Sequence, residues 1–318
     1  MPRVTMTRVM DPPDAPVPGR RQAEVEDELV GPVLAHAVTV VIPAFNEAGH
    51  VAQAIRDVTQ VMQQSGWTFE VIVVDDGSSD ETGTEALAEG VRVLRNRRNR
   101  GYGASLKRGV AAASYDWILI TDADGTYPAT AIPQLLALAD THAMVVGARI
   151  TGTRAIPLAR RPAKWFLTKL ASYLAERDVP DLNSGLRLIR RDLVERYGHL
   201  LPAGFSFTTT ITLAATCDDY EVAYVPIDYL ARVGESKIRP RHAYEFLLLV
   251  LRIIVFFNPL RVFVPLGLLM ASLGMVKFIY DLTLQNISES ALLGLLGALI
   301  VWAVGLLADQ NARIARRP

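Results

Sequence analysis

The sequence predicts an α/β domain with a doubly wound, mostly parallel sheet, followed by a helical tail with two membrane-spanning helices. Two observations predict this fold class. Between residues 37 and 240, short apolar runs rich in β-branched residues alternate with amphipathic helical segments, as in βαβ units. Near the end of the 318-residue chain, two apolar segments each approach the length of about 20 residues that crosses a bilayer as a helix.

Five apolar runs are predicted to be strands of the sheet. The first, "VTVVIP", is apolar throughout, as expected of a parallel strand that is buried on both faces. A helix should follow it, because apolar residues from Val51 to Met62 recur at 3.6-residue spacing. A second helix, with apolar residues from Ile132 to Leu138, precedes the last strand. The five runs are residues 38–43, 69–76, 91–94, 117–124 and 144–149.

Charged residues gather where these strands end. Asp75 and Asp76 end the second run, Asp122 and Asp124 lie at the end of the fourth, and Arg149 ends the fifth. Open α/β sheets bind ligands at the carboxyl ends of their strands. Two carboxylates so close together repel each other unless a cation or hydrogen-bond donors neutralise them. The acids therefore suit a nucleotide diphosphate and a hard divalent cation, Mg²⁺ or Mn²⁺, bound through oxygen.

Two stretches near these acids have plainer interpretations. Asp75 to Ser78 could simply form a turn, with Ser78, Ser79 or Asp80 capping the next helix. The stretch "RNRRNRGYGASLKRG" (95–109) is predicted to be a basic, glycine-loosened loop over phosphates that runs into a helix, and a solvated charged loop is the alternative. It lacks the third glycine of a dinucleotide fingerprint.

The composition excludes several function classes. Lys plus Arg and Asp plus Glu both number 33, so no global charge favours nucleic acid as a partner. Cys217 is the single cysteine, which rules out an internal disulfide and a cysteine-rich zinc site. The five histidines show no metal-binding spacing.

The termini and the tail are predicted as separate segments. Residues 1–36 are proline-rich, lack the apolar core of a signal peptide and should be a disordered tail. Residues 261–281 and 290–309 should span the membrane, and 310–318 should be a basic cytoplasmic tail. Residues 241–260 are interpreted as an interfacial amphipathic helix, with a third span as the alternative.

Charge around the two spans predicts their orientation. The connector "DLTLQNISES" contains no Lys or Arg, whereas arginines flank the pair on both outer sides. By the positive-inside rule, both termini and the α/β domain lie in the cytoplasm. The flanking arginines are Arg252, Arg261, Arg313, Arg316 and Arg317.

A set of motifs in fixed order resembles a known family. "VVIPAFNE", "VIVVDDGSSDET", "NRGYGASLKRG", "TDADGTYP", "GAR", "LNSGLRLIRR" and "RVGESKIRP" occur as in the inverting family-two glycosyltransferases that include dolichol-phosphate mannose synthases and bacterial polyprenyl-phosphate sugar transferases. The resemblance covers about residues 37–240. It implies a GT-A fold that transfers a sugar from a nucleotide sugar, with inversion, to a membrane lipid phosphate.

The resemblance also implies roles for single residues on the donor side. Asp76 is expected to contact the base, and Asp122 and Asp124 match the DxD motif, with Asp124 as the direct metal ligand. The family's mannose synthases carry a glutamine two positions after the second Asp, where this chain has Thr126. The residues that resemble the first nucleotide-binding loop are Pro43, Ala44, Asn46 and Glu47.

On the acceptor side, Arg149, Ser184 and Arg187 resemble contacts to the acceptor phosphate. Arg187 is the main candidate, because a guanidinium fork matches phosphate oxygens. The QxxRW signature of processive polysaccharide synthases is absent, which argues against chain elongation. The residues that resemble a mobile loop closing over the diphosphate are Arg232, Ser236 and Lys237.

The basic residues near the membrane have a plainer interpretation as ligands of anionic headgroups. It is preferred for four of them, which are Arg160, Arg161, Lys164 and Lys169.

These expectations describe a membrane-anchored transferase at the cytoplasmic face of the plasma membrane. It should move a sugar from GDP-mannose or a UDP-hexose to dolichyl or undecaprenyl phosphate, using Mg²⁺ or Mn²⁺. Its partners are then the nucleotide sugar, the polyprenyl phosphate and the lipid bilayer, without nucleic acid; whether it forms a homo-oligomer is left open. The alternatives are the same fold with another lipid or glycan acceptor, and a non-catalytic nucleotide-sensing membrane module, which the retention of both DxD acids disfavours.

Overall fold

The computed structural model describes residues 36–151, 169, 172–173, 177–204, 206–228, 255–285 and 288–315. Several of the expectations above lie outside these residues. They concern the N-terminal tail, the predicted headgroup ligands Arg160, Arg161 and Lys164, the predicted closing loop around Arg232, Ser236 and Lys237, most of the predicted interfacial helix, and residues 316–318 of the predicted basic tail.

Seven described strands form one mixed sheet in the order β3-β2-β1-β4-β6-β5-β7. β1 pairs in parallel with β2 and β4, β2 with β3, and β5 with β7, whereas β6 runs antiparallel to both β4 and β5. The five predicted strands are confirmed, and β6 and β7 add to them. The bounds are β1 Ala37–Ala44, β2 Thr68–Asp75, β3 Arg92–Arg95, β4 Trp117–Ile120, β5 Met144–Thr151, β6 Arg187–Arg190 and β7 Val222–Asp228.

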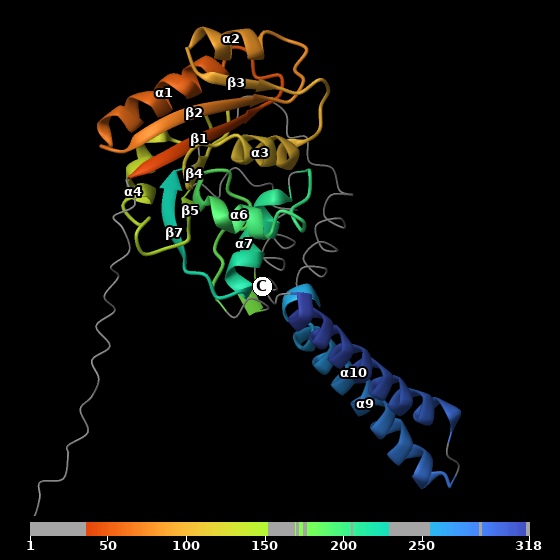
Figure 1. Ribbon diagram of the computed structural model, residues 1–318. Helices are drawn as coiled ribbons and strands as arrows, with labels where there is room; N and C mark the ends of the chain where they lie inside the picture. Colours follow the sequence, from red (N-terminus) through yellow and green to blue (C-terminus); the bar gives the residue numbers. More distant parts are fainter. Residues whose placement is uncertain are drawn as a thin grey trace, which may run out of the picture. The chain divides into compact units, whose positions relative to one another are not determined.

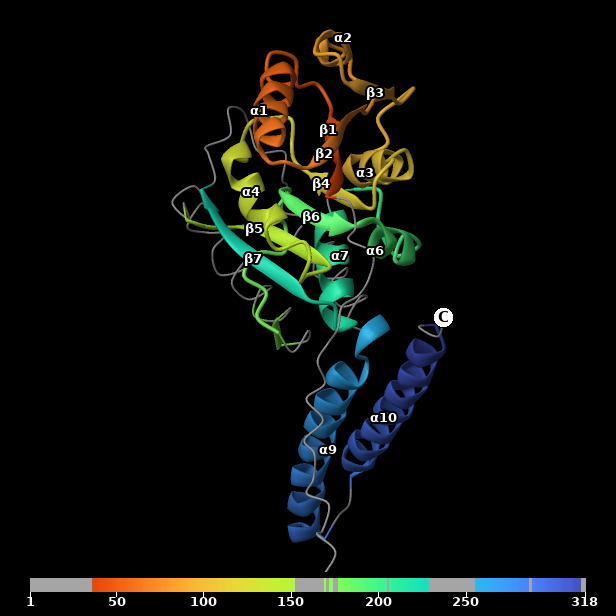
Figure 2. The same ribbon diagram turned by 60° about the vertical axis from the view of Figure 1, so that its left-hand side comes forward.

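Helices cover both faces of the sheet, which makes a three-layer domain (Figures 1 and 2). α1, α2 and α4 contribute to one hydrophobic core, and α3, α6 and α7 to the other. Their bounds are α1 Val51–Gln64, α2 Thr82–Ala88, α3 Tyr102–Ala111, α4 Ile132–Leu136, α6 Arg191–Arg196 and α7 Phe207–Cys217, with a 3₁₀ turn at Ala129–Ala131.

The strand β1 shows why its apolar run is continuous. Val40 and Ile42 face the core under α1, whereas Val41 faces the core under α3. Successive side chains of a strand point to opposite faces, so a strand between two helical layers needs apolar residues at every position. The central strands thereby hold their carboxyl ends, where the acidic residues lie, at one fixed edge.

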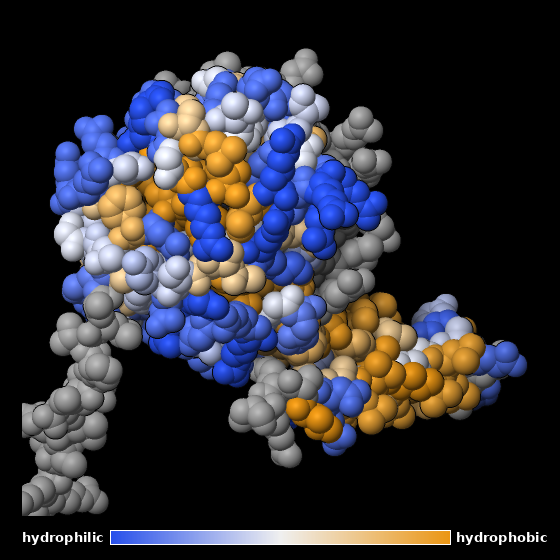
Figure 3. Space-filling model, turned by 45° about the horizontal axis from the view of Figure 1, so that its top comes forward, coloured by the Kyte–Doolittle hydropathy of each residue, from blue (hydrophilic) through white to orange (hydrophobic). Residues whose placement is uncertain are grey.

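Two long apolar helices follow the α/β domain in the chain. They are α9 Leu260–Thr283 and α10 Glu289–Ala315, and each extends slightly beyond the predicted span. Only 11% and 17% of their most apolar 18-residue windows are buried inside the protein, so they are not the core helices of a soluble domain. Among the described residues, these two helices have the length and composition to cross a membrane, and Figure 3 shows their mostly apolar surface.

The two long helices form an antiparallel hairpin that packs through small residues (Figure 2). A Cβ atom added to Gly274 would lie 3.0 Å from the backbone nitrogen of Leu295, and one added to Gly267 would collide with the ring of Trp302. At the turn, buried Asp281 accepts hydrogen bonds from Lys277 and from the Ser288 backbone nitrogen. Close approach at small residues is the usual basis of helix packing in a bilayer.

Candidate active site

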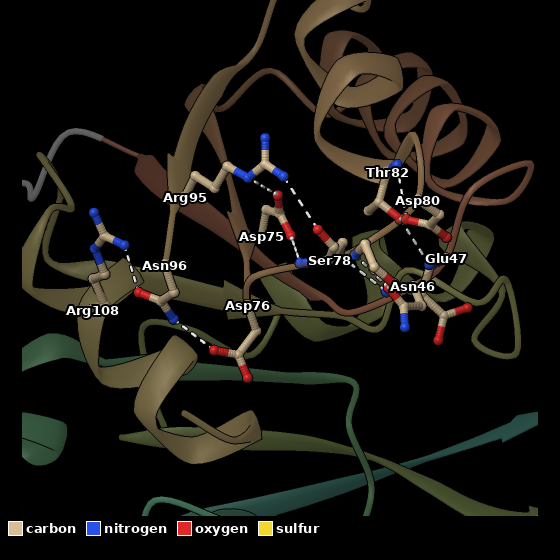
Figure 4. A network of polar contacts seen from close by, with 11 residues as sticks. Asn46, Glu47, Asp75, Asp76, Ser78, Asp80, Thr82, Arg95, Asn96 and Arg108 are labelled. Carbon is tan, nitrogen blue, oxygen red and sulfur yellow. Dashed lines mark hydrogen bonds and ion pairs between the residues drawn. The ribbon is translucent and has the colours of Figure 1, made fainter. Parts of the chain in front are cut away.

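The loops after β1, β2 and β4 meet at one edge of the sheet. Their strands run parallel and side by side, so the acidic motifs after β2 and β4 and the polar loop after β1 share this edge. This confirms the expectation that the charged residues gather at neighbouring carboxyl ends. Figure 4 shows the part of the edge formed by β1, β2 and β3.

The loop after β1 is held by side chains of the loop after β2 (Figure 4). The Asn46 backbone nitrogen donates to Ser78 Oγ at 3.0 Å, and the Glu47 nitrogen donates to Thr82 Oγ1 at 2.8 Å. Asn46 has a φ of 54°, a left-handed conformation that asparagine tolerates better than most residues. Of the four residues predicted to bind the nucleotide here, Asn46 is exposed and Glu47 half-buried, whereas Pro43 and Ala44 are buried in β1.

The contacts of Asp75 support the interpretation that residues 75–78 form a turn before the next helix. Its side chain is fully buried, its Oδ1 accepts from the Ser78 nitrogen at 2.8 Å, and its Oδ2 lies 3.2 Å from Arg95 Nε. Asp80 Oδ1 accepts from the nitrogen of Thr82, the first residue of α2, at 3.1 Å. Asp75 therefore forms the turn, and Asp80 supports the start of the helix.

Asp76 organises the loop that leads into α3. Its carboxylate accepts from Asn96 Nδ2 at 2.6 Å and from the backbone nitrogens of Arg100 and Gly101 at 2.9 and 2.8 Å. Asn96 Oδ1 in turn accepts from Arg108 Nη1 at 2.5 Å, so β3, the loop and α3 are joined (Figure 4). The contact between Asp76 and a base stays a prediction.

The glycines of the basic loop serve packing. A Cβ atom on Gly101 would lie 2.6 Å from the Ala203 carbonyl oxygen, and one on Gly103 would collide with the Pro202 carbonyl oxygen. The Ala104 nitrogen also donates to Ala203 O at 3.0 Å. Residues 202–204 thus cover the first turn of α3. The predicted helix after the basic loop is confirmed, and the position of the loop over phosphates stays a prediction.

The arginines of that loop are exposed, as in the alternative interpretation. Arg97, Arg98 and Arg100 all face solvent. Arg97 lines an open hollow of about 340 Å³ together with Gly77, Ser78, Arg95 and Asn96. These cations supply positive charge beside the acids of the strand ends.

Asp122 and Asp124 are held in different ways. Asp122 Oδ1 accepts a hydrogen bond at 3.0 Å from the hydroxyl of Tyr102, the first residue of α3. Asp124 Oδ1 accepts from both the nitrogen and the hydroxyl of Thr126, at 3.1 and 2.6 Å. Thr126, at the position of the family's glutamine, is buried and orients Asp124 from within the same loop.

The Tyr102 hydroxyl is a fixed donor. Burial raises its pKa well above the usual value, and the negative charge of Asp122 raises it further. Tyr102 therefore stays protonated at neutral pH and can only donate to the carboxylate. Sequence reasoning missed this contact, because Tyr102 reaches Asp122 only through the packing of α3.

The two acids have the chemistry of a site for Mg²⁺ or Mn²⁺. Within the described residues, no group of three or more His, Cys, Asp or Glu gathers that could hold an ion alone. Mg²⁺ commonly binds one or two carboxylates and takes its other ligands from substrate phosphates and water. Asp122 and Asp124 offer only oxygen donors, so they fit a cation that arrives with a nucleoside diphosphate.

Arg149 is paired with Asp181. Its Nε and Nη2 donate to the two oxygens of Asp181 at 2.7 and 2.8 Å, and its backbone nitrogen donates to the same carboxylate at 3.1 Å. Burial of Asp181 raises its pKa, but the hydrogen bonds and charge of Arg149 outweigh this and lower it. About a fifth of the Arg149 side chain remains exposed, so the guanidinium is oriented at the surface by a fixed partner.

Arg187 and Ser184 lie in the core. The Arg187 guanidinium is fully buried and donates to Ser184 O at 2.6 and 3.2 Å, to Thr208 O at 3.2 Å and to Thr212 Oγ1 at 3.1 Å. Ser184 Oγ donates to Gly147 O at 2.5 Å. Ser184, which precedes β6, is bonded to β5, and Arg187 is bonded to α7, so both side chains are buried in this structure. Their contact with an acceptor phosphate stays a prediction.

The mixed, mostly parallel sheet with helices on both faces is a GT-A-like fold. Residues 39–198 match the model described as glycosyl transferase family 2, and residues 258–314 match the GtrB C-terminal hairpin. The chain belongs to glycosyltransferase family 2 and is a glycosyltransferase.

Similar proteins were found among both sequences and structures. The chain is 32% identical to a dolichyl-phosphate hexose transferase of Haloferax volcanii over 64% of this chain and 87% of that protein. It is 30% identical to an undecaprenyl-phosphate 4-deoxy-4-formamido-L-arabinose transferase of Enterobacter sp. (strain 638), over 75% and 73%. The fold resembles glucosyl-3-phosphoglycerate synthase of Mycobacterium tuberculosis, with a TM-score of 0.56, 24% identity, and coverage of 69% and 78%.

Proposed function

We propose that this protein transfers a hexose from a nucleoside diphosphate sugar, with inversion, to a polyprenyl phosphate at the membrane. One observation carries the proposal: a family 2 domain with both DxD acids is followed on the same chain by an apolar helical hairpin. The relatives named above act on dolichyl and undecaprenyl phosphate, which supports this acceptor class. GDP-mannose and UDP-hexoses are the proposed donors.

In the proposed reaction, an oxygen of the acceptor phosphate attacks C1 of the sugar on the face opposite the nucleotide. The bond between C1 and the β-phosphate oxygen breaks, and the nucleoside diphosphate leaves with the electron pair. A phosphate monoester has a second pKa of about 6, so at neutral pH the acceptor is already largely a dianion. The chain then needs cationic groups to position the acceptor more than it needs a general base.

Asp124 and Asp122 are proposed to hold Mg²⁺ or Mn²⁺ together with the diphosphate of the donor. When bound there, the cation would stabilise the charge that develops on the leaving group. The structural neighbour was solved with Mn²⁺ and UDP, which is consistent with this assignment. The paired carboxylates, with Thr126 and Tyr102 as donors to them, are the part of the site that this chain supplies.

Arg149 is the proposed contact for the acceptor phosphate, because Asp181 orients its guanidinium while part of it stays exposed. Arg232, Ser236 and Lys237 remain the proposed closing loop over the diphosphate. The hairpin is proposed to anchor the domain at the cytoplasmic face of the membrane, with the connector between its helices on the other side.

The test is a transfer assay with the full-length protein in detergent. We expect a solvent-extractable, acid-labile glycolipid when one of GDP-mannose, UDP-glucose or UDP-galactose is supplied with undecaprenyl or dolichyl phosphate and Mn²⁺. Diacylglycerol, in place of the polyprenyl phosphate, is the control acceptor and should give no product. Product on diacylglycerol alone would replace the proposed acceptor with a neutral lipid.

A further inference from the structure

The carboxylate of Asp122 is confined from two sides by parts of the chain outside its own loop. On one side, the hydroxyl of Tyr102, the first residue of α3, donates to Oδ1 at 3.0 Å. On the other side lies Gly185, where an added Cβ atom would come within 2.7 Å of Oδ2 and 2.9 Å of Cγ. The carboxylate therefore has little room to turn away from Tyr102.

The backbone at Gly185, which limits the movement of the Asp122 carboxylate, is itself held by hydrogen bonds. The Gly185 backbone nitrogen donates to the Tyr127 hydroxyl at 2.7 Å. The carbonyl of the preceding Ser184 accepts two hydrogen bonds from the buried Arg187, whose guanidinium is also bonded to Thr208 in α7. Arg187 thus acts on the site through the backbone of Ser184 and Gly185.

Tyr102 is equally well held. Its ring packs against the core cluster under α3, α6 and α7. The first turn of α3 is fixed to residues 202–204 by the bond from Ala104 N to Ala203 O and by the close approach at Gly103. The hydroxyl consequently reaches Asp122 from a rigid support.

We propose that Tyr102 is a positioning residue that sets the orientation of the Asp122 carboxylate for the divalent cation and the diphosphate. The inference rests on the proposed function. A hydrogen-bond donor to a carboxylate ligand fixes the orientation of that ligand at the metal. Partners of metal ligands typically change metal affinity or activity by about 10- to 100-fold when they are removed.

The experiment compares Tyr102→Phe with Tyr115→Phe in the full-length protein. Tyr115 precedes β4 at the opposite end of that strand from Asp122 and serves as the matched control. Mn²⁺ binding is measured by electron paramagnetic resonance with saturating UDP or GDP. We expect Tyr102→Phe to weaken Mn²⁺ binding about 10-fold or more. Its melting temperature and its affinity for the nucleotide without metal should match those of Tyr115→Phe.

A second variant approaches the carboxylate from the other side. Gly185→Ala should push Asp122 away from its place and reproduce the loss of Mn²⁺ affinity. In transfer kinetics, both variants should lower kcat while the KM for the acceptor changes less than twofold. This split distinguishes positioning of the metal site from a general loss of structure.

Three outcomes would overturn the inference. Wild-type Mn²⁺ affinity and kcat in Tyr102→Phe would remove the positioning role and leave the proposed function standing. Parallel loss of melting temperature and metal-free nucleotide affinity would make Tyr102 a packing residue. A wild-type protein that binds nucleotide but no Mn²⁺ would overturn the metal assignment in the proposed function as well.

Discussion

At the scale of single residues, the two DxD acids depend on different parts of the chain. Asp124 is oriented by Thr126 two positions away, whereas Asp122 is oriented by Tyr102 and Gly185, which are distant in sequence. The hydrogen bonds that orient Asp124 lie within the loop after β4, so they form when that loop forms. The arrangement at Asp122 forms only when α3, β4 and the segment before β6 have packed together.

Asp124→Asn should lower turnover by about 10²-fold or more, because it removes a charged ligand from the centre that stabilises the leaving group. The unfolding midpoint should stay close to that of the wild type, since Asp124 lies in a loop at the sheet edge and is only half-buried. Turnover with Mn²⁺ and a thermal melt check both expectations. Full activity of the wild type in EDTA would contradict the metal assignment.

Arg187→Ala should destabilise the domain by roughly 3 kcal/mol or more, because it strands buried carbonyl groups of Ser184 and Thr208 and leaves a cavity. Nucleotide affinity and transfer should then fall together. Denaturant unfolding and calorimetry of the same variant test this. A stable variant with normal nucleotide affinity but no glycolipid formation would restore the acceptor role that the sequence suggested.

The position of Arg187 in the fold was harder to predict from the sequence than that of the acids, for one physical reason. Asp122 and Asp124 follow a strand whose four apolar residues are easily recognised. Arg187 begins β6, a four-residue strand with an arginine at each end, and its direction depends on an antiparallel position between β4 and β5. Strand order across a sheet is a long-range property that one short segment does not encode.

At the scale of elements, the helical hairpin depends on close contacts at glycine. Gly267→Ala should destabilise the packing of α9 on α10 by roughly 1–3 kcal/mol, because its Cβ atom meets the rigid ring of Trp302. Gly297→Ala is the matched control, since its Cβ atom meets only the flexible end of Met270, at 2.7 Å. Trp fluorescence during thermal unfolding in detergent compares the two; equal midpoints would contradict this packing.

Elements with strong periodicity were predictable, and contacts between elements were not. The continuous apolar runs of β1 and β2 and the two long apolar helices were identified from pattern alone. The glycines before and within α3 were interpreted as loosening a loop over phosphates, because nothing nearby in sequence shows that Ala203 approaches them. β7 was missed because Pro226 interrupts a short run that carries polar residues.

At the scale of the whole molecule, a glycosyltransferase family 2 domain and an apolar helical hairpin lie on one chain. Phe257 is fully buried and packs its ring against Tyr197, with 5.9 Å between centroids. The core of the α/β domain thus includes a residue beyond the predicted boundary at 240. This argues for a domain end after residue 257.

A chain truncated after Asn258 should keep nucleotide and Mn²⁺ binding, because the strands, both acid motifs and Phe257 remain. Transfer to long polyprenyl phosphates should fall sharply without the anchor, since the effective concentration of the acceptor at the membrane is lost. Truncation after Pro240 is the comparison and should be less stable, because it removes Phe257. Equal melting temperatures of the two truncations would contradict the revised boundary.

The most direct test of the account is the anomeric configuration of the product that the full-length enzyme makes from a polyprenyl phosphate and its nucleotide sugar. We predict a polyprenyl-phosphate sugar whose anomeric configuration, read by nuclear magnetic resonance, is opposite to that of the donor. The Asp124→Asn protein should form this product about 10²-fold or more slowly under the same conditions. A product with retained configuration, or donor hydrolysis without any glycolipid, would contradict the account.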